Sequence, residues 1–210
     1  MLIKVNNINI NYEVYGQGSP IILLHGNQET HEIFDNLIEK LEETHTVYAL
    51  DSRCHGKSDN PEDTIAFIKE LKISKPTFYG FSDGGIIGLL VSIKEPELLS
   101  NLIISGANIS PDVFTTFDML LTKLFYFFTR SKFIKMMLDE PNIPLEDLQK
   151  ISIPVHVLAG EKDVIKLEHT KLIANNIKNS TLEIIKGEKH GSYIIHSDKI
   201  YKIIKKYLED

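Results

Sequence analysis

Short apolar segments alternate with amphipathic segments along almost the whole chain, and this alternation constrains the fold most. Strand-like runs occupy 2–5, 10–15, 20–24, 46–50, 76–81, 101–105, 153–159 and 181–186. Helical patterns follow Thr30 and recur near 62–72, 84–94, 166–178 and 198–208. Strands that alternate with helices predict an α/β fold, with a mostly parallel central sheet of about eight strands and helices on both faces.

The run from Pro20 to Leu24 fixes the middle of this sheet. It reads Pro-Ile-Ile-Leu-Leu, without the polar alternation of a strand that has one face in water. A strand that is apolar on both faces is typical of the centre of a parallel sheet covered by helices.

One long segment lacks any strand pattern. About 45 residues separate the strand that ends near Ser105 from the one that begins at Ile153, and they are rich in phenylalanine and methionine. Because so long a structureless loop is improbable in a compact domain, we expect helices there. We predict a single domain over 1–210, with 109–150 as a short helical lid insertion. Its aromatic residues either roof a substrate pocket or pack against the sheet edge.

Composition excludes several classes of function. The net charge is −6, so the chain lacks the basic stripe that neutralises nucleic-acid phosphates. The single cysteine, Cys54, allows neither an internal disulfide nor a multi-thiolate metal site. The N-terminus lacks a secretory pattern, and no apolar run is long enough to cross a bilayer. We therefore expect a cytoplasmic protein with no nucleic-acid or membrane partner, no metal and no cofactor, and leave its oligomeric state open.

The segment Gly80-Phe81-Ser82-Asp83-Gly84 fits the pattern G-x-S-x-G between a strand and a helix. A serine on such a sharp turn projects its hydroxyl above the sheet edge, and the flanking glycines avoid collisions with neighbouring backbone. The helix N-terminus behind it favours developing negative charge. We predict that Ser82 is a catalytic nucleophile.

A serine nucleophile needs a base held in one tautomer by a carboxylate. Asp163 and His190 each follow a predicted strand, so both should lie at the same sheet edge as Ser82. The chain order Ser, Asp, His is that of α/β-hydrolases. Glu161 is a rival acid and His196 a rival base, but surface or capping roles suit them better. No pair among the histidines has metal-site spacing.

Two backbone donors are needed for the oxyanion of an acyl-transfer intermediate. We assign the N–H groups of Asn27, at the end of the segment His25-Gly26-Asn27, and of Asp83, the residue after the nucleophile. We expect His25 to order that loop rather than carry a proton. Phe81 and Asp83, the two variable residues of the motif, are candidate substrate contacts.

Together these residues resemble the α/β-hydrolase fold superfamily over nearly the whole chain. The strand that opens at Pro20 and ends in His25-Gly26 reads as in family members, and 51–58 looks like the family's D-x-R-G-x-G-x-S loop. In that loop Cys54 stands where the pattern has glycine. The elbow Gly-Phe-Ser-Asp-Gly-Gly is similar to that of biphenyl-hydrolase-like enzymes, including those that hydrolyse α-amino-acid esters.

The resemblance implies a serine hydrolase that cleaves a small carboxylic ester, thioester or amide through an acyl-enzyme. In the similar enzymes an acid at the position of Asp83 helps to hold the substrate's amino group. The alternative is that Asp83 is a carboxylate favoured by the helix dipole and pointing away from substrate. Two alternatives remain: a carbon–carbon bond hydrolase of the same fold, and a non-catalytic ligand-binding relative. Dehalogenases and epoxide hydrolases use a carboxylate nucleophile, which position 82 does not offer.

Overall fold

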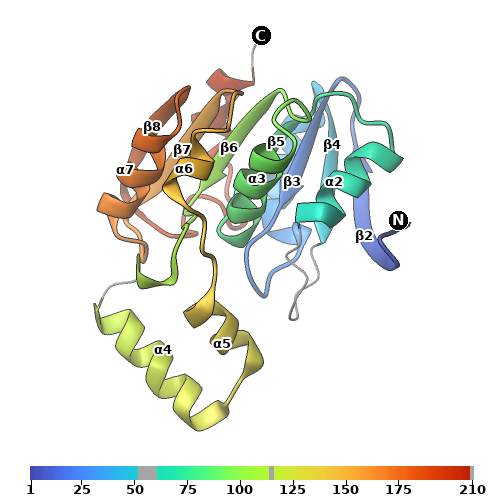
Figure 1. The fold of residues 1–210 in the computed structure, drawn as a ribbon. Coiled ribbons are helices and arrows are strands. Elements are labelled where there is room, and N and C mark those ends of the chain that lie inside the picture. Colours follow the sequence, from blue (N-terminus) through green and yellow to red (C-terminus); the bar gives the residue numbers. More distant parts are fainter. Residues whose placement is uncertain (52–60, 114–115, 209–210) are drawn as a thin grey trace.

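The computed structural model describes residues 1–51, 61–113 and 116–208, and within these the side chains of 112, 116–119, 132–133 and 136–137 are not described. Its centre is one eight-stranded sheet with the order β1-β2-β4-β3-β5-β6-β7-β8 (Figure 1). The strands are β1 (Leu2–Val5), β2 (Ile8–Tyr15), β3 (Ser19–Leu24), β4 (His45–Asp51), β5 (Thr77–Phe81), β6 (Asn101–Ser105), β7 (Val155–Lys162) and β8 (Ser180–Lys189).

Only the first part of the sheet is antiparallel. β1 pairs with β2 and β2 with β4 in antiparallel fashion, whereas all pairs from β4 through β8 are parallel. The hairpin between β1 and β2 turns at Asn6 and Asn7, both of which have positive φ, a conformation that asparagine tolerates better than most residues. This mostly parallel sheet confirms the predicted fold class.

Helices cover both faces of the sheet. One face carries α2 (Pro61–Glu70), α3 (Asp83–Lys94) and α7 (Leu167–Asn176), which lie in front of the sheet in Figure 1. The other face carries η1 (His31–Phe34), α1 (Asp35–Leu41), α8 (Lys199–Ile204) and η3 (Lys205–Tyr207).

The two faces bury two separate apolar cores, and β3 contributes to both. Ile22 and Leu24 pack with the α2–α3–α7 face, whereas Ile21 and Leu23 pack with the α1–α8 face. All four side chains are at most 2% exposed. The continuous apolar run therefore marks a strand covered on both faces, as its pattern predicts.

The segment between β6 and β7 is helical in its described part. It contains η2 (Pro111–Val113), α4 (Thr116–Thr129), α5 (Lys132–Asp139) and α6 (Leu145–Leu148). α4 and α5 contact each other and form a two-helix arm beyond the carboxyl ends of the strands (Figure 1). We call this pair the α4–α5 arm; the lid role predicted for 109–150 stays a prediction.

Within the described part of the chain, no helix is both long enough and apolar enough to span a membrane.

Candidate active site

Ser82 occupies the sharp turn between β5 and α3. Its backbone has φ +52° and ψ −116°, outside the conformations that non-glycine residues usually adopt. The turn is held on both sides: the Ser82 N–H donates to the Ser105 carbonyl at 2.8 Å, and the Ser82 carbonyl accepts from Gly85 and Ile86 at 2.9 and 3.1 Å. Such over-determination is what sustains a strained residue at a functional position.

The glycines on either side of Ser82 are required by close backbone approach. A Cβ at Gly80 would lie 2.3 Å from the Gly84 carbonyl oxygen, and one at Gly84 would lie 2.1 Å from the Leu24 carbonyl oxygen. α3 therefore begins in direct contact with the end of β3. This contact sets the position of Ser82 relative to the loop that follows β3.

The structure brings Ser82, Asp163 and His190 together at the carboxyl edge of the sheet. The Ser82 hydroxyl lies 3.1 Å from His190 Nε2, and His190 Nδ1 lies 2.7 Å from Asp163 Oδ1. Asp163 follows β7 directly and its side chain is fully buried, whereas the His190 side chain, just after β8, is 25% exposed. Because a carboxylate only accepts, Nδ1 donates to Asp163, which leaves Nε2 of neutral His190 free to accept the serine proton.

The rival residues lie in other interactions. Glu161 Oε2 accepts the Gly187 N–H at 2.8 Å, so it fastens β7 to β8. His196 Nδ1 is 2.9 Å from Asp35 Oδ2, on the exposed side of α1. Neither residue is among those that line the Ser82 cavity described below.

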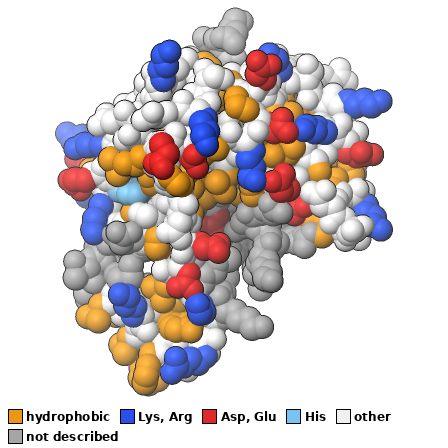
Figure 2. All heavy atoms as spheres, viewed as in Figure 1, with side chains coloured by type: hydrophobic (Ala, Val, Ile, Leu, Met, Phe, Trp, Pro, Cys, Tyr) orange, Lys and Arg blue, Asp and Glu red, His pale blue; other side chains and the backbone are white. Residues whose placement is uncertain are grey.

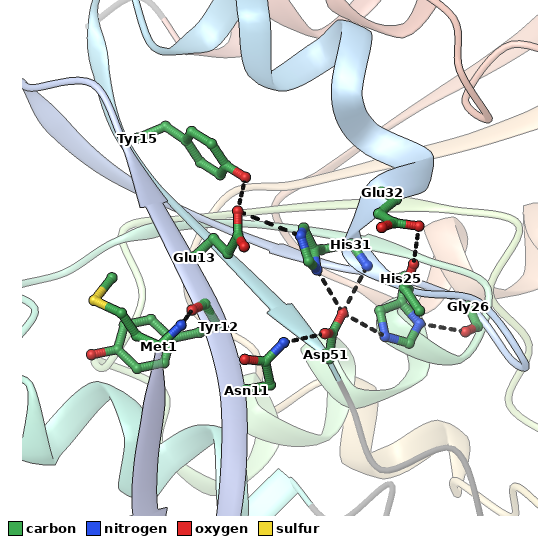
Figure 3. Close-up of polar contacts among 11 residues, drawn as sticks. Met1, Asn11, Tyr12, Glu13, Tyr15, His25, Gly26, His31, Glu32 and Asp51 are labelled. Atoms are coloured by element: carbon green, nitrogen blue, oxygen red, sulfur yellow. Dashed lines mark hydrogen bonds and ion pairs between the residues drawn. The ribbon is translucent and has the colours of Figure 1, made fainter.

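His25 anchors the loop that carries Asn27 (Figure 3). Its ring is buried, donates from Nδ1 to the Gly26 carbonyl at 2.7 Å, and places Nε2 3.9 Å from Asp51 Oδ1. Burial lowers the pKa of His25, which favours the neutral ring. This arrangement suits an ordering role for His25 rather than proton transfer.

Asp51, at the end of β4, fixes the far end of the same loop. Its Oδ1 accepts the His31 backbone N–H and the His31 Nδ1–H, both at 2.8 Å, while Oδ2 accepts from Asn11 at 2.7 Å (Figure 3). His31 Nε2 lies 3.7 Å from Glu13. Hydrogen bonds to Asp51 therefore hold the loop at its His31 end, while the bond from His25 to the Gly26 carbonyl orders its beginning.

Glu29 accepts a hydrogen bond from the start of the same loop, and its role was not predicted from the sequence. Its Oε2 accepts the Gly26 N–H at 3.1 Å, and a Cβ at Gly26 would meet both Glu29 Oε2 at 2.8 Å and Ser82 Cβ at 3.0 Å. Burial raises the pKa of Glu29, while the hydrogen bond from the Gly26 N–H and the charge that His190 carries when it is protonated oppose that rise. Its place in a loop at the carboxyl edge of a central strand was the only signal in the sequence.

Gly106 is a second residue that sequence reasoning missed. It follows β6 with φ +62°, and a Cβ there would lie 2.6 Å from His190 Cε1. The ring of Phe81 lies on the imidazole as well, with a centroid distance of 5.0 Å. The imidazole is therefore confined by packing as well as by Asp163.

A cavity of about 280 Å³ opens above Ser82. Asn27, Phe81, Asp83 and His190 all line it, so the predicted oxyanion donors and substrate contacts lie beside the nucleophile. Three acidic residues, Glu29, Asp83 and Glu140, also line it. Among the lining residues that the structure describes there is no lysine or arginine, so apart from His190 the ionisable residues of the cavity wall are acidic.

One predicted feature, the loop 51–58 with Cys54, falls almost wholly outside the described residues. The loop 51–58 is described only at Asp51, so the position of Cys54 is untested. Among described residues, no group of three or more histidine, cysteine, aspartate or glutamate side chains has an arrangement that could hold a metal ion.

Comparison with known proteins places the chain in a family. Residues 19–135 match the family described as alpha/beta hydrolase fold. The human serine hydrolase BPHL is 24% identical over 251 residues, which cover 99% of this chain and 85% of the relative.

Solved structures agree at the level of the fold. A meta-cleavage product hydrolase from Pseudomonas fluorescens IP01 superposes with a TM-score of 0.81 at 17% identity, covering 99% of this chain and 97% of that one. The enol-lactonase from Burkholderia xenovorans LB400 superposes with a TM-score of 0.79 at 16% identity, covering both chains completely.

Proposed function

The chain belongs to the α/β-hydrolase fold family and is a hydrolase; from that premise we propose that it is a serine hydrolase of small carboxylic esters. The observation that carries the proposal is the pair of contacts through one imidazole, 3.1 Å to the Ser82 hydroxyl and 2.7 Å to Asp163. Thioesters and amides are attacked by the same chemistry and belong to the proposed range.

The proposed reaction runs in two halves through an acyl-enzyme. His190 Nε2 takes the proton of Ser82 as the Oγ attacks the carbonyl carbon, and the oxyanion is held by the N–H groups of Asn27 and Asp83. His190 then gives that proton to the departing alcohol oxygen as the ester C–O bond breaks. Water repeats the sequence in the second half and releases the acid. Asp163 keeps Nδ1 protonated and stabilises the imidazolium.

Substitution and labelling of Ser82 test the nucleophile. We expect Ser82→Ala to lose turnover of p-nitrophenyl esters by about 10⁴-fold or more, and a fluorophosphonate probe to label the wild-type protein but not the variant. Ser152→Ala is the matched control, because Ser152 is exposed and its hydroxyl donates to the Pro96 carbonyl. Activity that persists in Ser82→Ala, with no labelling of wild type, would overturn the proposal.

The charge of the cavity supports a preference for a cationic acyl group. Asp83 lines the cavity together with Glu29 and Glu140, so three acidic residues lie around the place where a cationic acyl group would bind. We expect kcat/KM for an α-amino-acid ester to exceed that of its des-amino analogue, and Asp83→Asn to reduce the ratio on the order of tenfold. Equal rates with the two esters in wild type would refute this preference.

The carbon–carbon bond hydrolases share the same proposed machinery, so the substrate panel decides between them. A ring-fission product with a carbon–carbon bond to cleave is turned over by such an enzyme, whereas an esterase leaves it intact. A non-catalytic relative would turn over neither substrate and would not react with the fluorophosphonate.

A further inference from the structure

Three buried hydroxyl groups lie together next to the proposed catalytic residues. They belong to Tyr79 in β5, Ser105 at the end of β6 and Tyr193, three residues after His190. Each of the three residues is 0% exposed, and both tyrosine rings belong to the core of the α1–α8 face. Burying a hydroxyl group is costly unless it interacts with another polar group, so we expect each of the three to have a partner. We call them the hydroxyl row.

The end of β6 joins the hydroxyl row to the site. The Ser105 carbonyl accepts the Ser82 N–H at 2.8 Å, so this residue holds the backbone of the nucleophile. Gly106, the next residue, packs on the other two catalytic residues. A Cβ there would lie 2.6 Å from His190 Cε1 and 3.5 Å from Asp163 Oδ2. The end of β6 therefore borders all three residues of the proposed mechanism.

The protons of the hydroxyl row point in one direction. Tyr79 donates to Ser105 Oγ at 3.1 Å, and a serine hydroxyl that accepts a hydrogen bond still has its own proton to donate. Burial raises the pKa of the Tyr193 hydroxyl, and the Ser105 side chain opposes that rise, as a donor to the tyrosine oxygen does. The row therefore runs from Tyr79 through Ser105 to Tyr193, whose own proton remains to be donated.

The row ends near the second carboxylate oxygen of Asp163. Oδ1 of this residue accepts from His190 Nδ1 at 2.7 Å and from the Ile165 N–H at 3.0 Å. Oδ2 and the Tyr193 hydroxyl are both buried, and neither makes a hydrogen bond of ordinary geometry within the described part of the chain. The charge of Asp163 adds to the burial that raises the pKa of Tyr193, so the two groups interact.

A second carboxylate near Tyr193 is already occupied. Glu188 also acts on the pKa of Tyr193, but its Oε1 accepts from Lys199 at 2.7 Å and its Oε2 from the Ser192 hydroxyl at 2.6 Å. A tyrosine hydroxyl rotates about its C–O bond to aim its proton at an acceptor. Asp163 Oδ2 is the buried carboxylate oxygen that such a rotation would serve.

We propose that the hydroxyl row is an aligned series of dipoles whose positive end faces Asp163 Oδ2. It stabilises the charge of the carboxylate and fixes its position, and through Asp163 it holds the His190 imidazole. Aligned hydroxyl groups polarise one another, which strengthens the effect of the last one. Tyr193 is thus a positioning residue, since it is not among the residues that line the catalytic cavity. The proposal rests on the serine hydrolase function proposed above.

Tyr193→Phe removes the last hydroxyl of the row and keeps the shape of the ring. With p-nitrophenyl butyrate we expect kcat to fall about tenfold, the size of one hydrogen bond to a charged group, and KM to stay unchanged. We also expect the acid limb of the kcat/KM profile to move up by about half a pH unit, because a carboxylate that loses its donor favours the imidazolium more strongly.

Tyr12→Phe is the matched control for the loss of a tyrosine hydroxyl. Tyr12 is 9% exposed and packs edge-on against Phe67 in the core of the opposite face, so we expect wild-type kcat and a wild-type pH profile. The acidic residues that line the cavity with His190, namely Glu29, Asp83 and Glu140, are the same in both variants. A wild-type acid limb in Tyr193→Phe, or an equal fall in kcat in both variants, would overturn the proposal.

A double-mutant cycle tests whether the hydroxyls act in series. Tyr79→Phe and Ser105→Ala each remove one oxygen, and Ser105→Ala keeps the carbonyl that binds Ser82. We expect Tyr79→Phe to lower kcat about threefold in the wild-type background and to have no effect in Ser105→Ala, where the row is already broken. If the two losses simply multiply, the residues act by independent packing and the row does not exist.

The kinetics must be separated from association of the protein. Figure 2 shows hydrophobic side chains gathered over the α4–α5 arm, where Phe125 is 60% and Phe128 75% exposed, and such patches promote association. Each variant is therefore compared with wild type at equal mass by light scattering. A wild type that neither turns over esters nor reacts with the fluorophosphonate refutes the proposed function itself. An active wild type with an unchanged acid limb in Tyr193→Phe refutes the hydroxyl row alone.

Discussion

Gly84→Ala tests the contact that positions the proposed oxyanion donors. Gly84 is the second residue of α3, next to Asp83, and it faces the end of β3, from which the Asn27 loop departs. The added Cβ would lie 2.1 Å from the Leu24 carbonyl oxygen and 2.8 Å from that of His25. Because both obstructing atoms belong to the backbone, no side-chain rotation relieves the clash.

The size of the effect follows from the displacement needed. Ordinary van der Waals contact begins near 3.4 Å, so α3 and β3 must separate by about 1.3 Å, the difference between 3.4 and 2.1 Å. That movement separates the N–H groups of Asn27 and Asp83, and a misplacement of about 1 Å costs on the order of 10²-fold in rate. Overpacking also destabilises the fold by about 1–3 kcal/mol, which lowers Tm by roughly 2–4 °C per kcal/mol in a chain of this size.

Gly88→Ala is the control, because it places the same methyl group one helical turn later. Its Cβ would meet Leu102 Cδ1 at 2.6 Å and the ring of Phe78 at 3.0 Å, which are side-chain atoms rather than backbone. With p-nitrophenyl butyrate and a melting curve for each variant, we expect kcat to fall about 10²-fold in Gly84→Ala and less than about threefold in Gly88→Ala. Wild-type kcat in Gly84→Ala, or equal losses in both variants, would refute the reasoning.

Two further variants probe the surrounding network and the pH dependence of stability. Asp51→Asn weakens the hydrogen bonds to His31 and Asn11, so we expect the free energy of unfolding to fall by about 1–3 kcal/mol in thermal melts. In ester kinetics we expect kcat to fall with little change in KM. An unchanged kcat would mean that the loop holds its position without this carboxylate. Burial lowers the pKa of His156, whose ring stacks on that of Tyr207 with a distance of 3.8 Å between the ring centroids. The contribution of neutral His156 to the free energy of unfolding is therefore fully present above the unfolded-state pKa of about 6.5, and it is lost as the pH falls through the lower folded-state pKa. We expect His156→Asn to show a smaller drop in Tm between about pH 7 and pH 5 than wild type. Parallel pH profiles for the two proteins would contradict this.

The sequence predicts the sheet and the meeting of Ser82, Asp163 and His190 because both depend on local patterns. Apolar runs locate parallel strands, and parallel strands bring their carboxyl ends to one edge. The extension of β7 and β8 to Lys162 and Lys189 was not predictable, since these residues are exposed and carry no apolar signal.

Features that depend on distant partners also escape sequence reasoning. The position of Glu29 follows from a loop tied to Asp51, which belongs to the next strand of the sheet. The pattern of α4 identifies its apolar residues, but it does not indicate that Phe127 and Phe128 face away from the core. What an apolar residue packs against is a property of tertiary structure, so a single helix cannot encode it.

The wide spacing of Ser82, Asp163 and His190 along the chain affects how activity arises during synthesis. His190 follows Ser82 by 108 residues, and β6, β7 and β8 lie between them in the chain. At 5–20 residues per second the ribosome needs roughly 5–20 seconds to make the intervening segment. Under the proposed mechanism the nascent chain carries its nucleophile without a base throughout that interval. The same spacing means that a break between β6 and β7 would leave Ser82 on one fragment and both Asp163 and His190 on the other.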